Sequence, residues 1–188
     1  MPVSRLVIYP DDSNFIPGNR NDIQQAMAEL QFIGEALPAS DESLRFLIGE
    51  QFLNFVTFLG CSPAIEIEPP ADGSEDFCHI HISPLYQHPE FVTDAAGNGP
   101  RCPHCRYEEK HWQGLVAQWQ SDSSVQFQCP ECQQNTDVLK LNWRKSAIAA
   151  HVFVEVYSVF PNEAVLADKV LTALSQATGT EWKYFYSR

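Results

Sequence analysis

The 188-residue sequence lacks the segments that would direct it to secretion or place it in a membrane. No basic stretch followed by an apolar run and a cleavage site precedes Asp11, where the chain turns acidic. The most apolar run, residues 44–60, is interrupted by Arg45, Glu50 and Asn54, which a membrane span would exclude. We therefore expect a cytoplasmic protein without a membrane partner.

Basic residues are also scarce. The chain has 12 Lys and Arg against 24 Asp and Glu, for a net charge of −12, and residues 1–100 alone carry −12. Such a surface repels phosphate backbones, so non-specific binding of nucleic acid by the whole protein is disfavoured. Residues 101–145 carry +1 and are the exception.

Common catalytic motifs are missing as well. The sequence contains no G-x-x-x-x-G-K phosphate loop, no G-x-S-x-G nucleophile elbow and no H-E-x-x-H helix. The GNG at residues 97–99 is too short to predict a nucleotide site. Without a catalytic signature the sequence favours a binding role, although it leaves enzyme activity open.

The apolar spacing predicts an α+β fold. An apolar stripe from Ile23 to Leu37 predicts a helix stopped by Pro38, and a second stripe predicts a helix from Ser40 to Gly60. Strands are expected at residues 3–9, 150–160 and 181–188, a hairpin at residues 64–68 and 77–83, and a third helix between residue 161 and Gly179.

This order of elements favours a two-layer sandwich of helices on a mostly antiparallel sheet. We expect one discontinuous domain, residues 1–100 and 144–188, with residues 101–143 as an inserted module.

The inserted module holds two cysteine pairs of the same form, CPHC and CPEC, separated by 23 residues. Four thiolates suit the tetrahedral coordination that zinc prefers, and they leave no position open for water or substrate. The sequence therefore predicts a structural Zn²⁺ site formed by Cys102, Cys105, Cys129 and Cys132.

The two knuckles resemble those of zinc ribbons over residues 101–143. The resemblance implies short strands near residues 115–119, 125–128 and 137–143 around a structural Zn²⁺. Many zinc ribbons carry glycine after each second cysteine, where this sequence has Arg106 and Gln133. Rubredoxin-like iron is the alternative metal, and four metal-free core cysteines are the alternative to any metal. His104 and His111 are expected at the surface rather than as ligands.

The module also mixes aromatic and basic residues, which would suit nucleic-acid contact. Acidic residues of the same segment cancel much of this charge, and the tryptophans would equally serve to pack the module onto the main body. The residues in question are Arg101, Arg106, Lys110, Lys140, Arg144 and Lys145, with Trp112, Trp119 and Trp143.

A second candidate site lies in the expected hairpin. Alternation places His79 and His81 on one face of their strand, and Glu66 and Glu68 on the matching face of the other. Glu155, with His151, would extend this face if its strand lay beside the hairpin. The face would be a metal or ligand site, an acid–base catalytic site, or simply a solvated surface.

The sequence thus favours a zinc-binding intracellular protein that binds another protein or a small molecule, whose identity it leaves open. The alternatives are a metal- or acid/base-dependent enzyme using the His/Glu face, and a zinc-ribbon protein that binds nucleic acid. Cys61 and Cys78 are expected to be buried, unreactive thiols.

Overall fold

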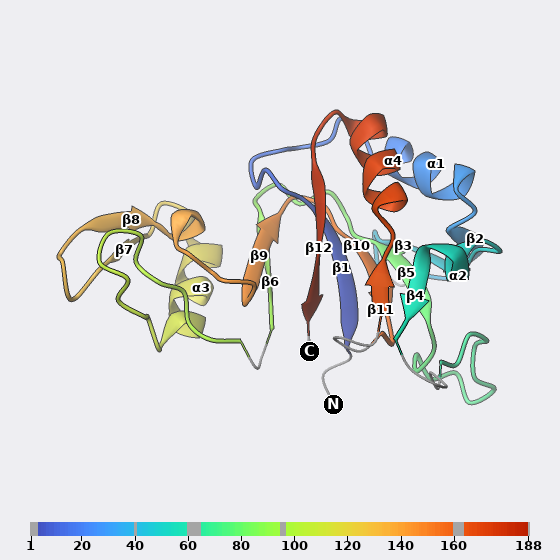
Figure 1. Ribbon diagram of the computed structural model, residues 1–188, viewed down its shortest axis with the longest axis horizontal. Coiled ribbons are helices and arrows are strands. Elements are labelled where there is room, and N and C mark those ends of the chain that lie inside the picture. Colours follow the sequence, from blue (N-terminus) through green and yellow to red (C-terminus); the bar gives the residue numbers. More distant parts are fainter. Residues whose placement is uncertain (1–3, 40, 60–64, 95–96, 160–163, 188) are drawn as a thin grey trace.

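The computed structural model describes residues 4–39, 41–59, 65–94, 97–159 and 164–187 (Figure 1). The helices among them are α1 (Asn21–Glu29), α2 (Phe52–Phe55), α3 (Trp112–Ser121) and α4 (Asp168–Thr178), with the 3₁₀ turn η1 (Val138–Lys140). The strands are β1 (Arg5–Pro10), β2 (Ile33–Leu37), β3 (Leu44–Ile48), β4 (Val56–Phe58), β5 (His79–Ile82), β6 (Glu90–Thr93), β7 (Gln126–Gln128), β8 (Asn135–Asp137), β9 (Ala147–Ala150), β10 (Val154–Tyr157), β11 (Ala164–Leu166) and β12 (Trp182–Ser187).

A six-stranded sheet forms the centre of the molecule, in the order β12-β1-β10-β5-β3-β2. Each neighbouring pair in this sheet is antiparallel. Three further two-stranded sheets pair β4 with β11, β6 with β9 and β7 with β8, again antiparallel. The expected mixed α+β fold with a mostly antiparallel sheet is confirmed. None of the described helices is long and apolar enough to cross a membrane.

The alternation of side chains along β1 explains how the sheet is covered. Leu6 and Ile8 point to one face, where they join the buried side chains of α1 and α4. Val7 points to the other face and is buried with residues of β6, β9 and β12. Fully burying each such side chain stabilises the fold by about 1.5–3 kcal/mol, so both coverings hold the sheet in place. Figure 1 shows α1 and α4 together on one side of the sheet, and β6 and β9 on the other.

The cysteine-rich segment has a hydrophobic cluster of its own. Trp112 and Trp119 of α3 are buried with Trp143, and Phe91 of β6 packs against both Trp119 and Trp143 with ring centroids 5.2 Å apart. Phe91 thus connects this cluster to the strands that cover the main sheet. In Figure 1 the segment projects from one end of the molecule.

The terminal elements agree with the sequence analysis. The predicted first and last strands correspond to β1 and β12, and Gly179 ends α4 with φ 75° and an N–H bond to the Ser175 carbonyl. The proposed opening of that helix at Pro161 and Asn162 lies outside the described residues, and α4 itself begins at Asp168 after β11. The single strand expected at residues 150–160 is interrupted, because residues 151–153 separate β9 from β10.

The predictions for residues 30–83 were largely wrong. The first helix ends at Glu29, and its supposed last turns form β2. The second helix is replaced by β3, the short α2 and β4, because β3 pairs with both β2 and β5. Residues 65–68 form no strand, so the expected hairpin does not exist, and β5 pairs instead with β3 and β10.

A close backbone approach joins the start of β2 to the end of β3. The Gly49 amide donates to the Phe32 carbonyl at 2.8 Å, and a Cβ at residue 49 would lie only 2.0 Å from the Gln31 carbonyl oxygen. Only glycine fits at this position without moving the backbone.

We expect Gly49→Ala to lower the free energy of unfolding by about 1–3 kcal/mol, because the added methyl group forces the two backbones apart. Gly18→Ala is the matched control, since no heavy atom lies within 4 Å of the added Cβ. Urea unfolding followed by circular dichroism measures both variants. Equal stability of the two variants would contradict the explanation for Gly49.

Candidate functional site

The structure brings the four cysteines of the two knuckles together. The metal-binding atoms of Cys102, Cys105, Cys129 and Cys132 all lie within 4.8 Å of one another. The Sγ atoms of Cys102 and Cys132 are 3.8 Å apart, and those of Cys105 and Cys129 are 3.5 Å apart. Four sulfurs bound tetrahedrally at ~2.3 Å from a metal would be separated by about 3.8 Å. The cluster therefore has the size that a bound metal ion requires.

Each cysteine pair sits in a tight backbone turn. In the first, the Cys102 amide donates to the Tyr107 carbonyl at 2.8 Å, and the Arg106 amide donates to the Cys102 carbonyl at 3.0 Å. The second turn, which connects β7 to β8, repeats both bonds at the equivalent residues, from Cys129 to Gln134 and from Gln133 to Cys129. The matched bonds make the two turns two copies of one knuckle.

The structure explains the missing glycines. Arg106 and Gln133 both adopt the left-handed backbone conformation, with φ of 67° and 60°. Glycine is the usual residue in this conformation, because adopting it costs any other residue about 1–2 kcal/mol of conformational free energy. The knuckle geometry thus forms without glycine. Other contacts in the module must offset the conformational strain of Arg106 and Gln133.

The sulfur atoms influence one another electrostatically. Desolvation opposes ionisation of Cys102, but hydrogen bonds from the backbone N–H groups of Cys105 and His104 lower the pKa of its thiol to about 7. The Tyr107 amide favours the Cys105 thiolate, yet desolvation and the neighbouring sulfurs outweigh it and raise the pKa of Cys105 to about 12. Several thiolates at this spacing therefore need a cation to coexist.

No histidine takes part in the cluster. His104 lies inside the first knuckle and is exposed, as is His111, in agreement with the expectation that neither is a ligand. Within the described part of the chain, the four cysteines are the one group of three or more His, Cys, Asp or Glu side chains that could hold a metal ion.

The segment between the knuckles differs from the zinc-ribbon pattern. Residues 115–119, expected as a strand, belong to α3, whose buried Trp112, Val116 and Trp119 pack the module's interior. The strand expected at residues 125–128 corresponds to the short β7, but the strand expected at residues 137–143 is wrong: β8 ends at Asp137 and η1 follows it. The helix forms because apolar residues recur every three or four positions from Trp112 to Trp119.

The tryptophans of the module and two of its six basic residues, Arg101 and Arg144, make internal contacts. Trp112, Trp119 and Trp143 are each no more than 8% exposed. Arg144 contacts Glu108 at 3.0 Å and donates to the Gly99 carbonyl at 2.8 Å. The structure thus supports the alternative in which the three tryptophans pack the interior of the protein, rather than the one in which they contact nucleic acid.

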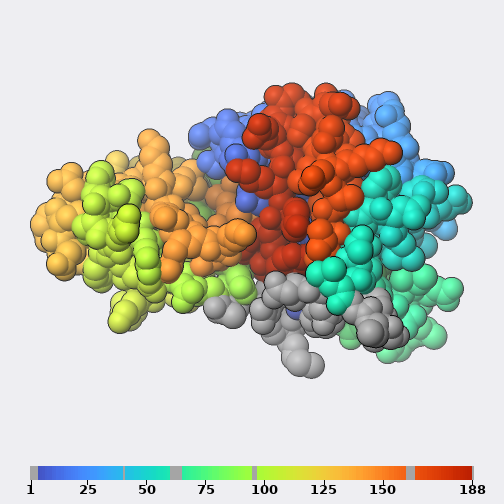
Figure 2. Space-filling model, viewed as in Figure 1, coloured from blue at the N-terminus to red at the C-terminus, as the bar shows by residue number. Residues whose placement is uncertain are grey.

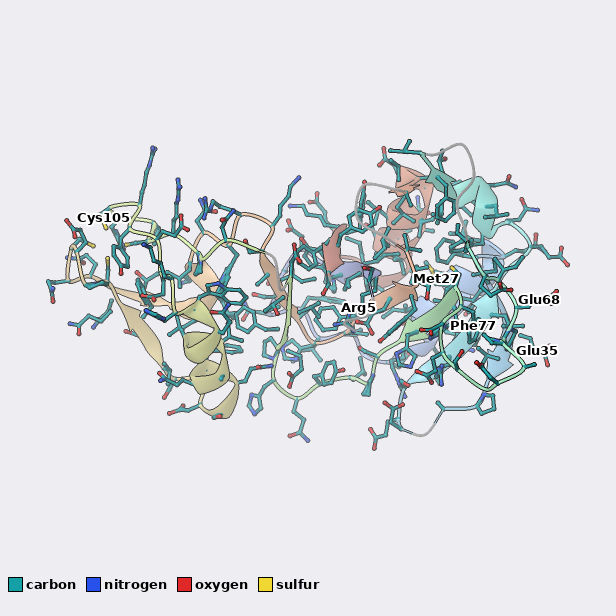
Figure 3. All side chains as sticks on the ribbon, turned by 90° about the horizontal axis from the view of Figure 1, so that it is seen from below. Arg5, Met27, Glu35, Glu68, Phe77 and Cys105 are labelled. Carbon is teal, nitrogen blue, oxygen red and sulfur yellow. The ribbon has the colours of Figure 1, made fainter. Side chains whose placement is uncertain are left out.

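The second predicted site is rearranged. His79 and His81 lie on β5, and Glu155 of β10 lies directly opposite His81, as the sequence analysis anticipated. Glu66 and Glu68 are exposed and outside any strand, and neither side chain bonds to a histidine in the described residues. Figure 3 shows Glu68 and Phe77 at the end of the molecule opposite Cys105, so this face is remote from the metal site.

His79 is held in its neutral form. It is 2% exposed, stacks on Tyr157 with centroids 4.7 Å apart, and its Nδ1 lies 2.9 Å from the Phe77 carbonyl oxygen. Its Nε2 lies 3.4 Å from an Arg45 nitrogen, which can only donate. Burial lowers the pKa of His79, with Arg45 adding to this effect. A histidine held in this way is a structural residue rather than a metal ligand.

His81 joins a chain of polar contacts. Its Nε2 lies 2.7 Å from the Ser43 hydroxyl, and its Nδ1 lies 3.6 Å from Glu155, whose other oxygen contacts Arg5 at 2.9 Å. The Ser43 hydroxyl donates its proton to Asp41, and this bond lowers the pKa of Asp41. Ser43 therefore accepts from His81 instead of being activated by it.

Sequence reasoning missed Ser43 and Arg45 because it assigned both to a helix. It also grouped His151 with Glu155, but His151 precedes β10, is 5% exposed and contacts the Tyr86 carbonyl at 2.8 Å. Cys78 is fully buried, and burial raises the pKa of its thiol to about 12, as expected for an unreactive cysteine. Cys61 lies outside the described residues.

No protein-family model matches this chain, and no curated protein or solved structure does so either. The chemistry of its own residues is therefore the basis for assigning a function.

The buried His79 predicts a pH dependence of stability. Because its pKa is lowered on folding, the unfolded state binds the proton more readily, so the stabilisation is complete above the unfolded pKa of about 6.5 and declines as the pH falls below it. We expect His79→Gln to reduce the loss of unfolding free energy between pH 7 and pH 5. Urea titrations at several pH values measure that slope.

His88→Gln is the control, because His88 is exposed in a loop. It should keep the slope of the unsubstituted protein. An unchanged slope in His79→Gln would contradict the neutral state assigned to His79.

Proposed function

We propose that this is a zinc-binding protein in which a structural Zn²⁺ holds residues 101–143 together, and that it acts as a binding domain for another protein or ligand. The observation that carries the proposal is the cluster of four sulfur atoms within 4.8 Å of one another. A set of four thiolates fills the zinc coordination shell, so the metal has no position for substrate.

Zinc is favoured over iron as the occupant. Both metals accept two cysteine knuckles, but rubredoxin-like knuckles favour the glycines that are replaced here by Arg106 and Gln133. Metal-bound thiolates persist in a reducing compartment, which supports the cytoplasmic location included in the proposal. Iron would give a coloured, redox-active protein, so the two metals are readily distinguished.

The metal's role in the proposal is to stabilise the module. The cluster around Trp112, Val116 and Trp143 is small for an independently folding unit. Zinc binding to such sites contributes about 10–16 kcal/mol to folding, which far exceeds the strain of two left-handed knuckle residues. In this proposal, residues 101–143 form a zinc ribbon inserted in the α+β domain, with α3 between its knuckles.

Binding of nucleic acid receives less support than binding of protein. The net charge is −12, and the three tryptophans of the module are buried. Arg101 and Arg144 both contact Glu108, at 3.5 Å and 3.0 Å, so part of the basic charge is already paired. A protein or small molecule is therefore the proposed partner.

We expect purified protein to carry one zinc ion per chain and to be colourless. Cys102→Ser and Cys129→Ser should each remove the metal and unfold the module, because the remaining thiolates no longer enclose the ion. Elemental analysis measures the metal, and hydrogen exchange of the backbone amides of α3 measures the folding of the module.

Cys78→Ala serves as the matched control, since it removes a buried thiol outside the cluster. It should keep its full zinc content. Cysteine variants that retain both metal and amide protection would overturn the proposed role of the cluster, and stoichiometric iron would overturn the choice of zinc.

A second candidate function is acid–base catalysis at the sheet face. It is favoured by one arrangement, in which Ser43, His81 and Glu155 follow one another at 2.7 Å and 3.6 Å like a nucleophile, a base and an orienting carboxylate. Two observations oppose catalysis by Ser43. The side chain is buried, with 4% of its surface exposed, and its hydroxyl group donates its proton to Asp41 rather than to His81.

We therefore expect no reaction of Ser43 with a fluorophosphonate probe. Such a reaction would form an Oγ–P bond, release fluoride and pass the hydroxyl proton to His81. Intact-mass measurement detects the added mass, and Ser43→Ala is the control. Labelling that requires both Ser43 and His81 would favour the enzyme over the binding domain.

A further inference from the structure

The four cysteines of the cluster differ in their exposure to solvent. Cys102 and Cys129, the first cysteine of each knuckle, are 2% and 0% exposed and are buried in the hydrophobic cluster of the module. Cys132 is half-buried, whereas Cys105 and both residues beside it are exposed. Figure 3 shows Cys105 at the end of the molecule opposite Glu68. A small molecule in solution therefore reaches Cys105 more readily than it reaches the other three cysteines.

A buried sulfur lies close to the exposed one. The Sγ atoms of Cys105 and Cys129 are 3.5 Å apart, although the two residues belong to different knuckles. A disulfide bond is about 2.05 Å long, so the two sulfurs need only a small approach to form one. Cys102 and Cys132 are the other pair across the knuckles, with their Sγ atoms 3.8 Å apart. The exposed sulfur therefore has a neighbour with which it can form a disulfide.

The proposed metal site would make the exposed sulfur reactive. A bound metal ion holds its cysteine ligands as thiolates, and the thiolate is the form that attacks an oxidant. Oxidation is therefore fastest at a cysteine that is both a thiolate and exposed. Cys78, which lies outside the cluster, is fully buried, and burial raises the pKa of its thiol to about 12. Among the described cysteines, Cys105 is the one that combines a place in the cluster with an exposed side chain. The space-filling view shows the module that carries it projecting into solvent from the rest of the molecule (Figure 2).

We infer that Cys105 is the site at which peroxide oxidises the cluster, and that Cys129 is its partner in the resulting disulfide. The Cys105 thiolate attacks one oxygen of hydrogen peroxide, the O–O bond breaks, and Cys105 becomes a sulfenic acid as hydroxide leaves. The Cys129 thiolate then attacks the Cys105 sulfur, so that an S–S bond forms, the S–O bond breaks and a second hydroxide leaves. The two sulfurs together lose two electrons, and the peroxide is reduced to two hydroxide ions.

This oxidation would release the metal. A disulfide between Cys105 and Cys129 leaves only the thiolates of Cys102 and Cys132 as ligands, which is too few to hold a structural zinc ion. The module then loses the metal that stabilises its small hydrophobic cluster. A thiol reductant restores both thiolates, so the change is reversible. The inference rests on the proposed structural zinc, and adds that the folding of residues 101–143 depends on the redox state of the surroundings.

Titration of reduced, zinc-loaded protein with hydrogen peroxide tests the inference. We expect zinc release, detected with a chromogenic chelator, together with faster hydrogen exchange of the α3 amides. Trypsin cleaves after lysine and arginine, so it separates residues 102–106, with Cys105, from residues 111–140, with Cys129. A disulfide across the knuckles joins these two peptides, whereas a disulfide within one knuckle leaves them separate. Fragmentation of the joined peptides by mass spectrometry identifies the two cysteines.

Cys105→His separates the exposed sulfur from the metal site as a whole. Three cysteines and one histidine also form a structural zinc site, so this variant should keep its zinc. Its zinc release by peroxide should be slower by about tenfold or more, because the accessible thiolate is gone. Cys78→Ala is the matched control and should release zinc at the rate of the unsubstituted protein.

Alkylation of the unsubstituted protein gives a second measurement that does not depend on any variant. Limiting iodoacetamide, a small neutral reagent, forms an S–C bond to a thiolate and releases iodide. Cys105 should carry most of the first label on zinc-loaded protein, because it is the exposed thiolate. Peptide fragmentation locates that label.

Each contrary outcome would overturn the inference. A first disulfide within one knuckle, or a first label on a cysteine other than Cys105, would reject the assigned site. Unchanged zinc release from zinc-loaded Cys105→His would do the same. Zinc-loaded protein that keeps its metal in excess peroxide would reject the sensitivity to oxidation. Metal analysis before peroxide is added keeps these failures separate, because a chain purified without zinc would reject the proposed function itself.

Discussion

Mutual repulsion of neighbouring thiolates is the constraint on which the cysteine-rich half of this structure depends. The sulfurs of Cys102 and Cys105 meet those of Cys132 and Cys129 at 3.8 and 3.5 Å, at the end of a module whose hydrophobic cluster is small. Burial and the neighbouring sulfurs raise the pKa of the Cys105 thiol, and Arg106 and Gln133 adopt left-handed conformations. In the proposed function, a bound metal accounts for both the geometry of the cluster and the stability of the module.

The sequence was informative wherever structure depends on neighbouring residues. Cysteine spacing predicted the cluster because ligand chemistry requires pairs separated by two residues, and the Gly179 stop was predicted because a helix end favours a left-handed residue. The charge balance of the tryptophan-rich segment likewise weakened the nucleic-acid hypothesis from the sequence alone. These features require no information about distant parts of the chain.

The errors arose where distant pairing decides the structure. The apolar spacing from Leu44 to Phe58 fits a helix, but β3 gains partners on both sides in β2 and β5, and the chain turns through α2 into β4 instead. The same mistake hid Ser43 and Arg45, so the polar face was expected to use Glu66 and Glu68 rather than the residues actually beside the histidines.

The fold separates three chemical environments. The cysteine cluster lies at one end, the polar network of His81 and Glu155 lies within the central sheet, and a groove is lined by residues of β9, β11 and β12. In the proposed function a metal in the first stabilises the module, and the second links β1, β10 and β5 through partly buried ion pairs. In this account, the metal and the polar network hold the structure in shape.

X-ray absorption at the zinc edge of the purified protein is the measurement that tests the central claim most directly. The account predicts one zinc ion per chain with four sulfur neighbours at ~2.3 Å and no nitrogen or oxygen neighbour. A zinc ion with nitrogen or oxygen in its coordination shell, or a properly folded chain without any metal, would contradict it.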